Sequence, residues 1–390
     1  MSEFDDIRPY NDEEVRPCIE RLLADPEFID AIIRLRFPNL GKHLPFLLRG
    51  TVRKRVRKEM ASVRSVQDFQ NVIEGYFAKL IERTVDTLSV SGLDGLPREK
   101  AALFISNHRD ITMDPAFVNW VLYHNGFTTV RIAIGDNLLT KPFASDLMRL
   151  NKSFIVNRSA KAPREKLKAA KHLSRYIHHS VLHDNENVWI AQREGRAKDG
   201  LDKTNPAVIS MLAISRDKSQ NFADYIRDAN IIPVSISYEY DPLDQAKARE
   251  VFEKETTGEY HKEEHEDVIS IARGIAGYKG NIHLSFGEPL HGDYENAEAV
   301  TEELDKQILS HYVLHPSNCI AYEMLEKKSP AVPVGEKGVL FTSQDWQAQR
   351  EKFREQIATC NSRYLDTLLR AYANPVYTHL KLHTDAGSGN

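Results

Sequence analysis

The stretch AALFISNHRDITMDP, residues 101–115, joins a short apolar run to a polar cluster and then to a proline. The run at residues 101–106 is typical of a buried strand, and Pro115 favours the first turn of a helix with Asp114 as its N-cap. Strand, helix and strand alternate from here on, which predicts an α/β fold with a largely parallel sheet of about six or more strands flanked by helices. The other expected strands are residues 129–135, 152–157, 187–192, 230–239 and 281–287, and helical periodicity occupies residues 115–123, 164–181 and 206–215.

The chain of 390 residues is longer than one hydrophobic core usually serves, and its patterns divide it into three expected parts. Residues 1–88 have helical periodicity and form a basic, amphipathic N-terminal region. Residues 89–328 hold the alternating strands and helices. Residues 329–390 begin as a linker with proline and glycine and continue as a helical C-terminal extension, so helical material is expected on both sides of the α/β domain.

Composition excludes several classes of protein. The net charge of −4 gives no whole-chain attraction to nucleic acid, so no nucleic-acid partner is expected. Cys18, Cys319 and Cys360 lie far apart in the sequence and predict neither a disulfide framework nor a metal site. No secretory leader begins the sequence, and no apolar run reaches the roughly 18 residues that a transmembrane helix needs. We therefore expect a protein of the cytoplasm, free or on a membrane surface.

Residues 31–64 concentrate positive charge in a chain that is negative overall. Ten lysines and arginines face one acid, Glu59, a local charge of +9, and apolar residues such as Phe46, Leu47 and Leu48 are interleaved with them. A basic helix with an apolar stripe is typical of a helix that lies on an anionic membrane surface. A solvated charged face on a packed helix explains the pattern equally well, and both interpretations are open at this point.

Residues that suit acid–base catalysis follow the first expected strand. His108 has Asp110 and Asp114 within six residues, and Asn107 and Arg109 flank it. A histidine held by a carboxylate can take a proton from a hydroxyl nucleophile. Open α/β folds place their sites at the carboxyl edge of the sheet, where this cluster would lie. A capping aspartate beside a surface histidine is the simpler explanation of the cluster taken alone.

Three further clusters follow or form later strands, and their order strengthens the catalytic interpretation. Cations lie at both ends of the strand at residues 152–157, and the segment QREGRAKDG, residues 192–200, combines glycines, carboxylates and cations. Arginine binds phosphate through two hydrogen bonds, and glycine lets a ligand approach the backbone. The substrate-binding residues expected from these clusters are Lys152, Arg158, Glu194, Gly195, Arg196, Lys198 and Pro233.

Taken in this order, the clusters resemble the four motifs of the glycerol-3-phosphate and 1-acylglycerol-3-phosphate acyltransferase superfamily, whose first motif is an NHxxxxD box. The resemblance covers about residues 90–290, and FGEPL at residues 286–290 is similar to a strand end common in that domain. The matching segments are Asn107-His108-Arg109 with a following aspartate, residues 154–158, Glu194-Gly195-Arg196 and residues 232–234.

The resemblance implies a peripheral membrane enzyme of phospholipid biosynthesis on the cytoplasmic side of the inner (plasma) membrane. It would move a fatty acyl group from CoA or acyl carrier protein to the hydroxyl of glycerol-3-phosphate, of 1-acylglycerol-3-phosphate or of another lipid acceptor. His108 would be the general base, oriented by an aspartate, Asn107 and Arg109 would belong to the substrate site, and Arg158 and Arg196 would hold the phosphate. No cofactor and no metal are implied. The competing interpretation is a membrane-surface binding protein on an inactive acyltransferase scaffold.

Two departures from the family pattern leave residue assignments open. Five residues separate His108 from Asp114, where the family has four, and Asp110 is only two positions away. Asp114 is favoured as the partner because Pro-Ala-Phe after it resembles the start of the family's next helix, with Asp110 as the alternative. In the third motif Arg196 follows Gly195 directly, one position early, so that either Arg196 or Lys198 is expected to face the phosphate.

Overall fold

The computed structural model describes residues 3–37, 45–263, 266–342 and 346–387. The chain forms two compact units, each made of two separate segments. One comprises Met1–Lys79 and Val130–Tyr176, and the other comprises Leu80–Thr129 and Ile177–Asn390. The expected three-part division follows the chain and is not the division into compact units, because the first unit combines N-terminal helices with a segment from the middle of the sequence. In the described ranges no helix is long and apolar enough to cross a bilayer.

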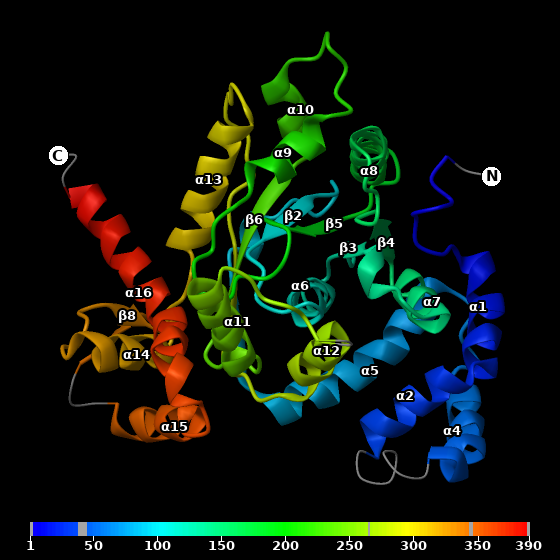
Figure 1. Cartoon of the computed structure of the whole chain (residues 1–390). Helices are drawn as coiled ribbons and strands as arrows, with labels where there is room; N and C mark the ends of the chain where they lie inside the picture. Colours follow the sequence, from blue (N-terminus) through cyan, green and yellow to red (C-terminus); the bar gives the residue numbers. More distant parts are fainter. Residues whose placement is uncertain (1–2, 38–44, 264–265, 343–345, 388–390) are drawn as a thin grey trace. The chain divides into compact units, whose positions relative to one another are not determined.

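Five neighbouring strands of the main sheet form the centre of the second unit (Figure 1). Its neighbouring strands pair in parallel except for β6 and β7, which are antiparallel. All eight residues of β6 are buried, which is the continuous apolar pattern expected of a strand covered on both faces. The strands, in spatial order, are β1 (Val85–Ser91), β7 (Gly280–Phe286), β6 (Ile231–Tyr238), β2 (Leu103–Ser106) and β5 (Val188–Ala191).

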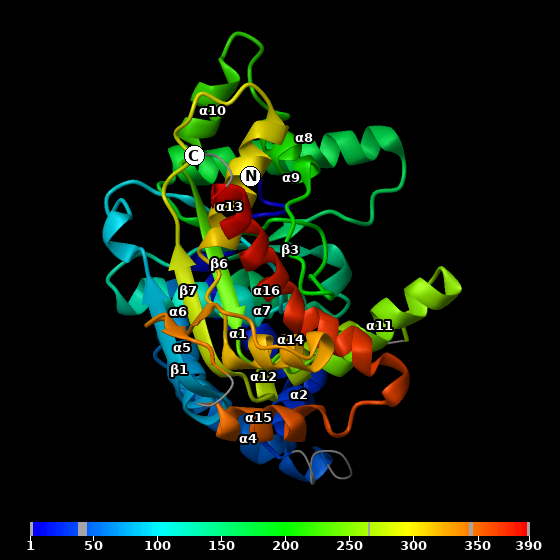
Figure 2. The ribbon, with the colours of Figure 1, turned by 90° about the vertical axis from the view of Figure 1, so that its left-hand side faces the viewer.

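Helices cover this sheet and connect its strands. α13 packs on β6 and on α9, and Figure 2 shows β6 and β7 side by side. Asn205 and Asn296 accept hydrogen bonds from the first turns of α9 and α13, which is why these helices begin where they do. The helices of this part are α6 (Met113–His124), α9 (Pro206–Ala213), α10 (Phe222–Asp228), α11 (Asp244–Thr257), α12 (Glu266–Ala276) and α13 (Ala297–Ser310), with the 3₁₀ turn η1 (Leu93–Gly95) after β1.

The C-terminal helices share a hydrophobic core with α11 within the second unit. Figure 1 shows α16 beside α14 in this region, and α11 packs against α16. The expected linker is part of this core, because Val332 and Val334 are buried in it and residues 333–334 pair with a second short strand. The elements are α14 (Pro316–Glu326), β8 (Pro333–Val334), β9 (Val339–Leu340), α15 (Gln347–Ile357), η3 (Ser362–Tyr364) and α16 (Leu365–Gly387).

The first unit joins N-terminal helices to a parallel pair of strands from the middle of the chain. Its core contains buried residues of the first helices together with Leu150, so the N-terminal region packs on α7. Asp25 ends one helix and caps the next, where its carboxylate accepts from the Glu27 and Phe28 amides. The elements are α1 (Asp12–Ala24), α2 (Pro26–Arg36), α4 (Pro45–Glu59), β3 (Arg131–Gly135), η2 (Asp136–Leu138), α7 (Pro142–Leu150) and β4 (Ser153–Val156), while α5 (Val66–Thr84) and α8 (Pro163–Leu182) have residues in both units.

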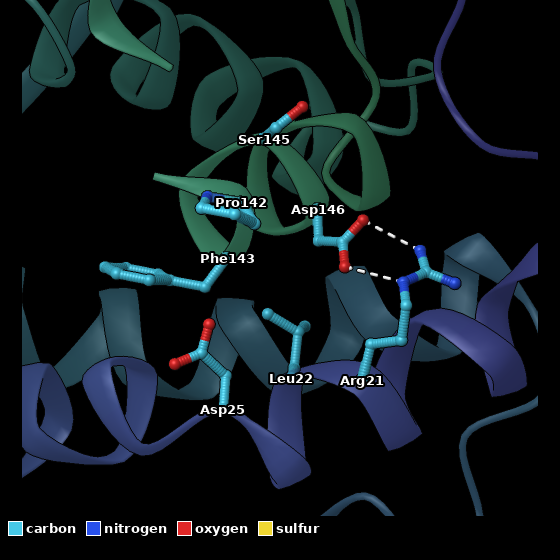
Figure 3. Close-up of a pocket in the computed structure, with 7 residues that line it drawn as sticks. All are labelled: Arg21, Leu22, Asp25, Pro142, Phe143, Ser145 and Asp146. Atoms are coloured by element: carbon cyan, nitrogen blue, oxygen red, sulfur yellow. Dashed lines mark hydrogen bonds and ion pairs between the residues drawn. The ribbon is translucent and has the colours of Figure 1, made fainter. Parts of the chain in front are cut away.

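A pocket of about 310 Å³ lies between α1 and α7 within the first unit (Figure 3). Arg21 crosses one side of it and forms two hydrogen bonds, of 2.9 and 2.8 Å, with the carboxylate of Asp146. The Tyr10 hydroxyl donates to the same carboxylate at 2.6 Å. These groups are thus paired with one another across the pocket.

The predicted fold class is confirmed: the chain is α/β with largely parallel strands, flanking helices and helical segments at both ends. Each predicted strand corresponds to one observed between β2 and β7. The sequence pattern missed β1, whose residues VDTLSVS follow α5 with no turn and are half polar. An edge strand of this kind is held by its ladder with β7 and not by an apolar pattern.

Candidate active site

The polar loop after β2 lies at the carboxyl edge of the main sheet. Ser106 ends β2 and is in register with Ala191 of β5 on one side and Val234 of β6 on the other. Because β2 and β5 are parallel, the loops that follow them leave the sheet at the same edge. The two segments that the sequence singles out, residues 107–114 and 192–200, are therefore neighbours.

His108 and Asp114 form a hydrogen-bonded pair in this loop. The imidazole Nδ1 lies 2.8 Å from Asp114 Oδ2. The same oxygen accepts the backbone N–H groups of Arg109 at 2.7 Å and Asp110 at 2.9 Å. An oxygen that already accepts two backbone donors is an acceptor for the imidazole as well, which makes Nδ1 the protonated nitrogen and leaves the lone pair on Nε2.

The environment of His108 leaves one edge of its ring open. Asp114 is fully buried, whereas 14% of the His108 side chain is exposed. Trp189 of β5 lies edge-on to the imidazole, with 5.9 Å between the ring centroids. Within the described part of the chain no protein group bonds Nε2 of His108. The pair thus presents an unprotonated nitrogen at the surface of the site, as a general base requires.

Asp110, the alternative partner, has a different role in the structure. One of its carboxylate oxygens accepts the amides of Thr112 and Met113, both at 2.9 Å, so it caps the start of α6. Burial, followed by the negative charge of Asp114, raises the pKa of Asp110. α12 covers this carboxyl at Gly274, where an added Cβ would lie 2.1 Å from Asp110 Oδ2. Of the two carboxylates left open by the sequence, the structure therefore places Asp114 against His108.

The loop after β5 is tied to the His108 loop through its backbone. The Ala197 amide donates to the His108 carbonyl at 2.7 Å. Glu194 and Gly195 are exposed, and Gly195 has a φ of +73° with open space where a side chain would be. A backbone of this shape, open at one glycine beside the candidate base, gives a ligand room to approach.

Of the two cations that the third motif left open, only one is unpaired. Lys198 forms an ion pair with Glu250 of α11, which also accepts from Lys254 at 2.7 Å. Arg196 is half-buried and has no hydrogen bond or ion pair with any residue that the structure describes. Its position next to Ala197 places it one residue from the tie to His108. Of the two side chains, Arg196 is therefore the one whose guanidinium is available to a ligand.

Residues 87–237 match the family model described as Acyltransferase. This segment is an acyltransferase domain. The match agrees with the resemblance to the glycerolipid acyltransferase superfamily and includes the loops of His108 and Arg196. The comparison with curated proteins found no match.

Among solved structures, one match is the 1-acyl-sn-glycerophosphate (LPA) acyltransferase PlsC of Thermotoga maritima. It shares 15% sequence identity with this chain, covers 76% of this chain and 94% of its own, and has a TM-score of 0.34.

Two residues expected to bind substrate face inward in the acyltransferase domain. Asn107 is fully buried and exchanges two hydrogen bonds with the backbone of Ile236, at 2.9 and 2.8 Å. The Arg109 guanidinium bonds Asp202 at 2.5 Å and lies over the ring of Tyr312. In this structure both side chains hold the loop through hydrogen bonds, and their participation in substrate binding stays a prediction. Asn107 and Arg109 both donate to Asp202, which thereby joins the segment after β5 to the loop after β2.

The remaining expected residues divide between the two compact units. Pro233 is buried within β6, where it shapes the strand and offers no group to a ligand. Lys152 precedes β4 with a φ of +60°, and the Arg158 amide donates to Asp136 at 3.0 Å, both within the first unit. Their participation in substrate binding stays a prediction. In the described residues no group of three His, Cys, Asp or Glu could hold a metal ion.

Sequence reasoning missed three residues that build the site. Tyr238, the last residue of β6, donates its hydroxyl to Asp114 Oδ1 at 2.7 Å. Lys247 of α11 donates to the Arg109 carbonyl at 2.6 Å, and Asp202 joins Asn107 to Arg109. Tyr238 is the next-to-last residue of the expected strand at residues 230–239, so its position near a strand end was a usable signal. Lys247 and Asp202 carried none, because each lies in a charged segment without a motif.

Proposed function

We propose that this chain is an O-acyltransferase of phospholipid biosynthesis that acts on glycerol-3-phosphate or 1-acylglycerol-3-phosphate. The observation that carries the proposal is the His108–Asp114 pair, with Nδ1 bonded to the carboxylate and Nε2 open. The unpaired guanidinium of Arg196, close to the pair along the tied loops, supports an acceptor with a phosphate group. Another lipid acceptor with a hydroxyl and an anionic group fits the same arrangement.

The reaction would proceed by direct attack of the acceptor on a thioester. Nε2 of His108 takes the proton of the acceptor hydroxyl while the hydroxyl oxygen forms a bond to the carbonyl carbon of the thioester. The C–S bond then breaks, and the imidazolium returns the proton to the leaving sulfur. Asp114 keeps Nδ1 protonated and stabilises the imidazolium between these steps. CoA or acyl carrier protein supplies the acyl group as a substrate, and the scheme uses no cofactor or metal.

The test is acyl transfer by the purified chain with a panel of acceptors. Labelled acyl-CoA and acyl carrier protein are each offered with glycerol-3-phosphate, 1-acylglycerol-3-phosphate, lyso-ornithine lipid and glycerol. Transfer to one of the phosphate-containing acceptors, lost in His108→Ala, is the expected result. Transfer only to lyso-ornithine lipid would show that the acceptor is a lipid without a glycerol phosphate group and would overturn that part of the proposal. A folded protein without transfer to any acceptor would refute the enzyme and favour a binding protein on an inactive scaffold.

The basic N-terminal segment, residues 31–64, is proposed as the contact with an anionic membrane surface on the cytoplasmic side. Residues 38–44 of this segment, including Lys42, lie outside the described residues. In α4 the apolar stripe is divided: Val52 and Val56 are buried in the helical core, whereas Phe46 and Leu47 are 59% and 62% exposed. The exposed pair is available to enter the lipid interface.

The cations of α4 are divided in the same way. Arg49 is paired with Asp30, and Arg55 with Glu59. Lys54, Arg57 and Lys58 are exposed and have no ion pair with a described residue. Each cation near an anionic surface contributes about 1 kcal/mol to binding, and this contribution weakens with added salt. The exposed apolar pair adds a part that salt does not weaken.

Vesicle flotation separates this proposal from a merely solvated charged face. A variant with Arg53, Lys54, Arg55, Arg57 and Lys58 changed to Gln is expected to float less than wild type on anionic vesicles at low salt. The matched control removes five exposed cations from α8 and the segment just before it, so that both variants have the same net charge. Its substitutions are Lys161, Arg164, Lys166, Lys168 and Lys171 to Gln. Equal flotation of the first variant and wild type would reduce residues 31–64 to a charged face of the fold.

A further inference from the structure

Tyr238 connects the last residue of β6 to the candidate base through a buried carboxylate. Its backbone is paired with Ile282 of β7, and its ring lies against Phe117 of α6, with 6.0 Å between the centroids. The side chain is thus held by two elements other than its own strand. Its hydroxyl bonds Asp114 Oδ1 at 2.7 Å.

The two oxygens of Asp114 are not equivalent. Oδ2 accepts from His108 and from two backbone amides, and Oδ1 accepts from Tyr238. Because Asp114 is fully buried, water cannot replace the phenol at Oδ1 without opening the site. The Tyr238 hydroxyl thus fixes the plane of the carboxylate and neutralises part of its charge.

We propose that Tyr238 is a positioning residue of the acyl-transfer reaction, acting on His108 through Asp114. Its phenol holds the Asp114 carboxylate in the orientation that presents Oδ2 to His108 Nδ1. The hydrogen bond to Oδ1 also reduces the negative charge that acts on the imidazolium of His108. This inference rests on the proposed function, because it assigns the phenol a role in the same proton transfer. Tyr238 itself does not touch the reacting atoms.

The phenol acts only as a donor over the pH range of an assay. Burial, followed by the negative charge of Asp114, raises the pKa of Tyr238 well above the ordinary value of a phenol. The other charged groups around the pair are Asp110 in the same loop, Asp241 after β6, Lys247 of α11 and Lys279 before β7. Burial lowers the pKa of Lys279 to about 8, so that this group titrates on the alkaline side of the profile. Since the pKa of Asp110 is raised, the acid side of the profile reports Asp110 together with the His108 pair, and the NMR titration of His108 separates the two.

Removal of the phenol hydroxyl is expected to shift the acid limb of the pH profile of kcat in one direction. In Tyr238→Phe the ring still packs on Phe117, but Asp114 Oδ1 loses its donor and the carboxylate becomes more negative towards His108. The imidazolium is then favoured, so the base is lost at a higher pH. We expect the acid limb of kcat to move up by about half to one pH unit, which is the shift that the net contribution of a single hydrogen bond corresponds to. At the wild-type optimum kcat is expected to fall about tenfold, with KM for the acceptor nearly unchanged.

Tyr225→Phe is the matched control. Tyr225 of α10 is buried to the same degree and bonds the Leu212 carbonyl at 3.2 Å, with no contact to the pair. Loss of a buried hydroxyl should lower the denaturation midpoint of both variants. Only Tyr238→Phe should move the acid limb of the kcat profile. If the phenol had only a structural role, the acid limb would stay in place in both variants.

A second substitution tests the same hydrogen bond in the opposite direction. Replacement of Tyr238 by 3-fluorotyrosine keeps the ring and makes the phenol a stronger donor, so the acid limb should move down. This arm also decides the case in which Tyr238→Phe does not fold.

Titration of His108 by NMR of protein with ¹³C-labelled histidine, assigned with His108→Gln, follows the imidazole without any turnover. A chain without transferase activity whose His108 titration moves up in Tyr238→Phe and down with fluorotyrosine would refute the proposed reaction and retain the coupling. Titrations that coincide in all three proteins, or that move in the reverse directions, overturn the proposal for Tyr238.

Discussion

Exchange of Asp114 for Asn removes the charge of the candidate pair while keeping its shape. Two backbone amides, those of Arg109 and Asp110, point at the oxygen that also faces His108. An amide nitrogen placed there would meet two N–H groups at 2.7 and 2.9 Å, so the introduced side chain must turn its oxygen to that side. Its NH₂ group then faces the Tyr238 hydroxyl, which can accept as well as donate.

This orientation sets the size of the effect. With an oxygen still opposite Nδ1, His108 keeps its tautomer, and the variant loses only the charge that stabilises the imidazolium. A hydrogen bond to a charged group contributes about 1.5–3 kcal/mol, which corresponds to a fall in kcat of about 10- to 150-fold. A wrong tautomer would cost on the order of 10⁴, as found when an amide replaces the aspartate of a serine-protease triad.

Steady-state acyl transfer by Asp114→Asn and Asp110→Asn, under identical conditions, checks the reasoning. Asp110→Asn should stay within about threefold of wild type, because Asp110 does not bond His108 and an Asn side-chain oxygen can still accept the Thr112 and Met113 amides. If Asp110→Asn is the more damaging change, Asp110 orients the base in solution. A fall of about 10⁴ in Asp114→Asn would instead show that the two backbone amides do not control the introduced group.

Three further predictions concern single positions. His108→Ala should lower kcat by about 10²–10⁴ at unchanged fold, and retention of more than half the wild-type kcat would remove His108 from the mechanism. Arg196→Gln should raise KM for a phosphate-containing acceptor more than Lys198→Gln does, since Lys198 is already paired; equal KM values in the two variants would contradict the assignment. Gly274→Ala should lower the free energy of unfolding in urea by about 1–3 kcal/mol, because the new Cβ meets the buried carboxyl of Asp110. Gly75→Ala is the control and should not destabilise the chain, because its Cβ would lie in open space. Similar denaturation midpoints for the two variants would argue against close contact of α12 with the His108 loop.

The sequence by itself determined the fold class and the approximate place of the candidate site. Apolar runs and helical periodicity alternate strongly enough to predict the strands between β2 and β7. The polar residues around His108 follow a buried strand directly, and a parallel strand brings its end to the ligand-binding edge of the sheet. These inferences are local, because each depends on residues within about ten positions of one another.

Only the tertiary structure decided which polar groups face the site. Asn107 and Arg109 belong to the first motif, yet they turn towards Ile236 and Asp202, about 130 and 95 residues further along the chain. The choice of Asp114 over Asp110 likewise depended on backbone amides and on α12, neither of which a spacing rule describes.

Dependence on distant residues also explains why neither the contact of Tyr238 with Asp114 nor the ion pair of Lys198 was predicted. Tyr238 reaches Asp114 because β6 and α6 pack together, and Lys198 is neutralised because α11 places Glu250 beside it. Such contacts join residues between 52 and 124 positions apart. They follow from the order and register of strands and from the packing of helices on them, and periodicity within one segment carries no information about its distant neighbours.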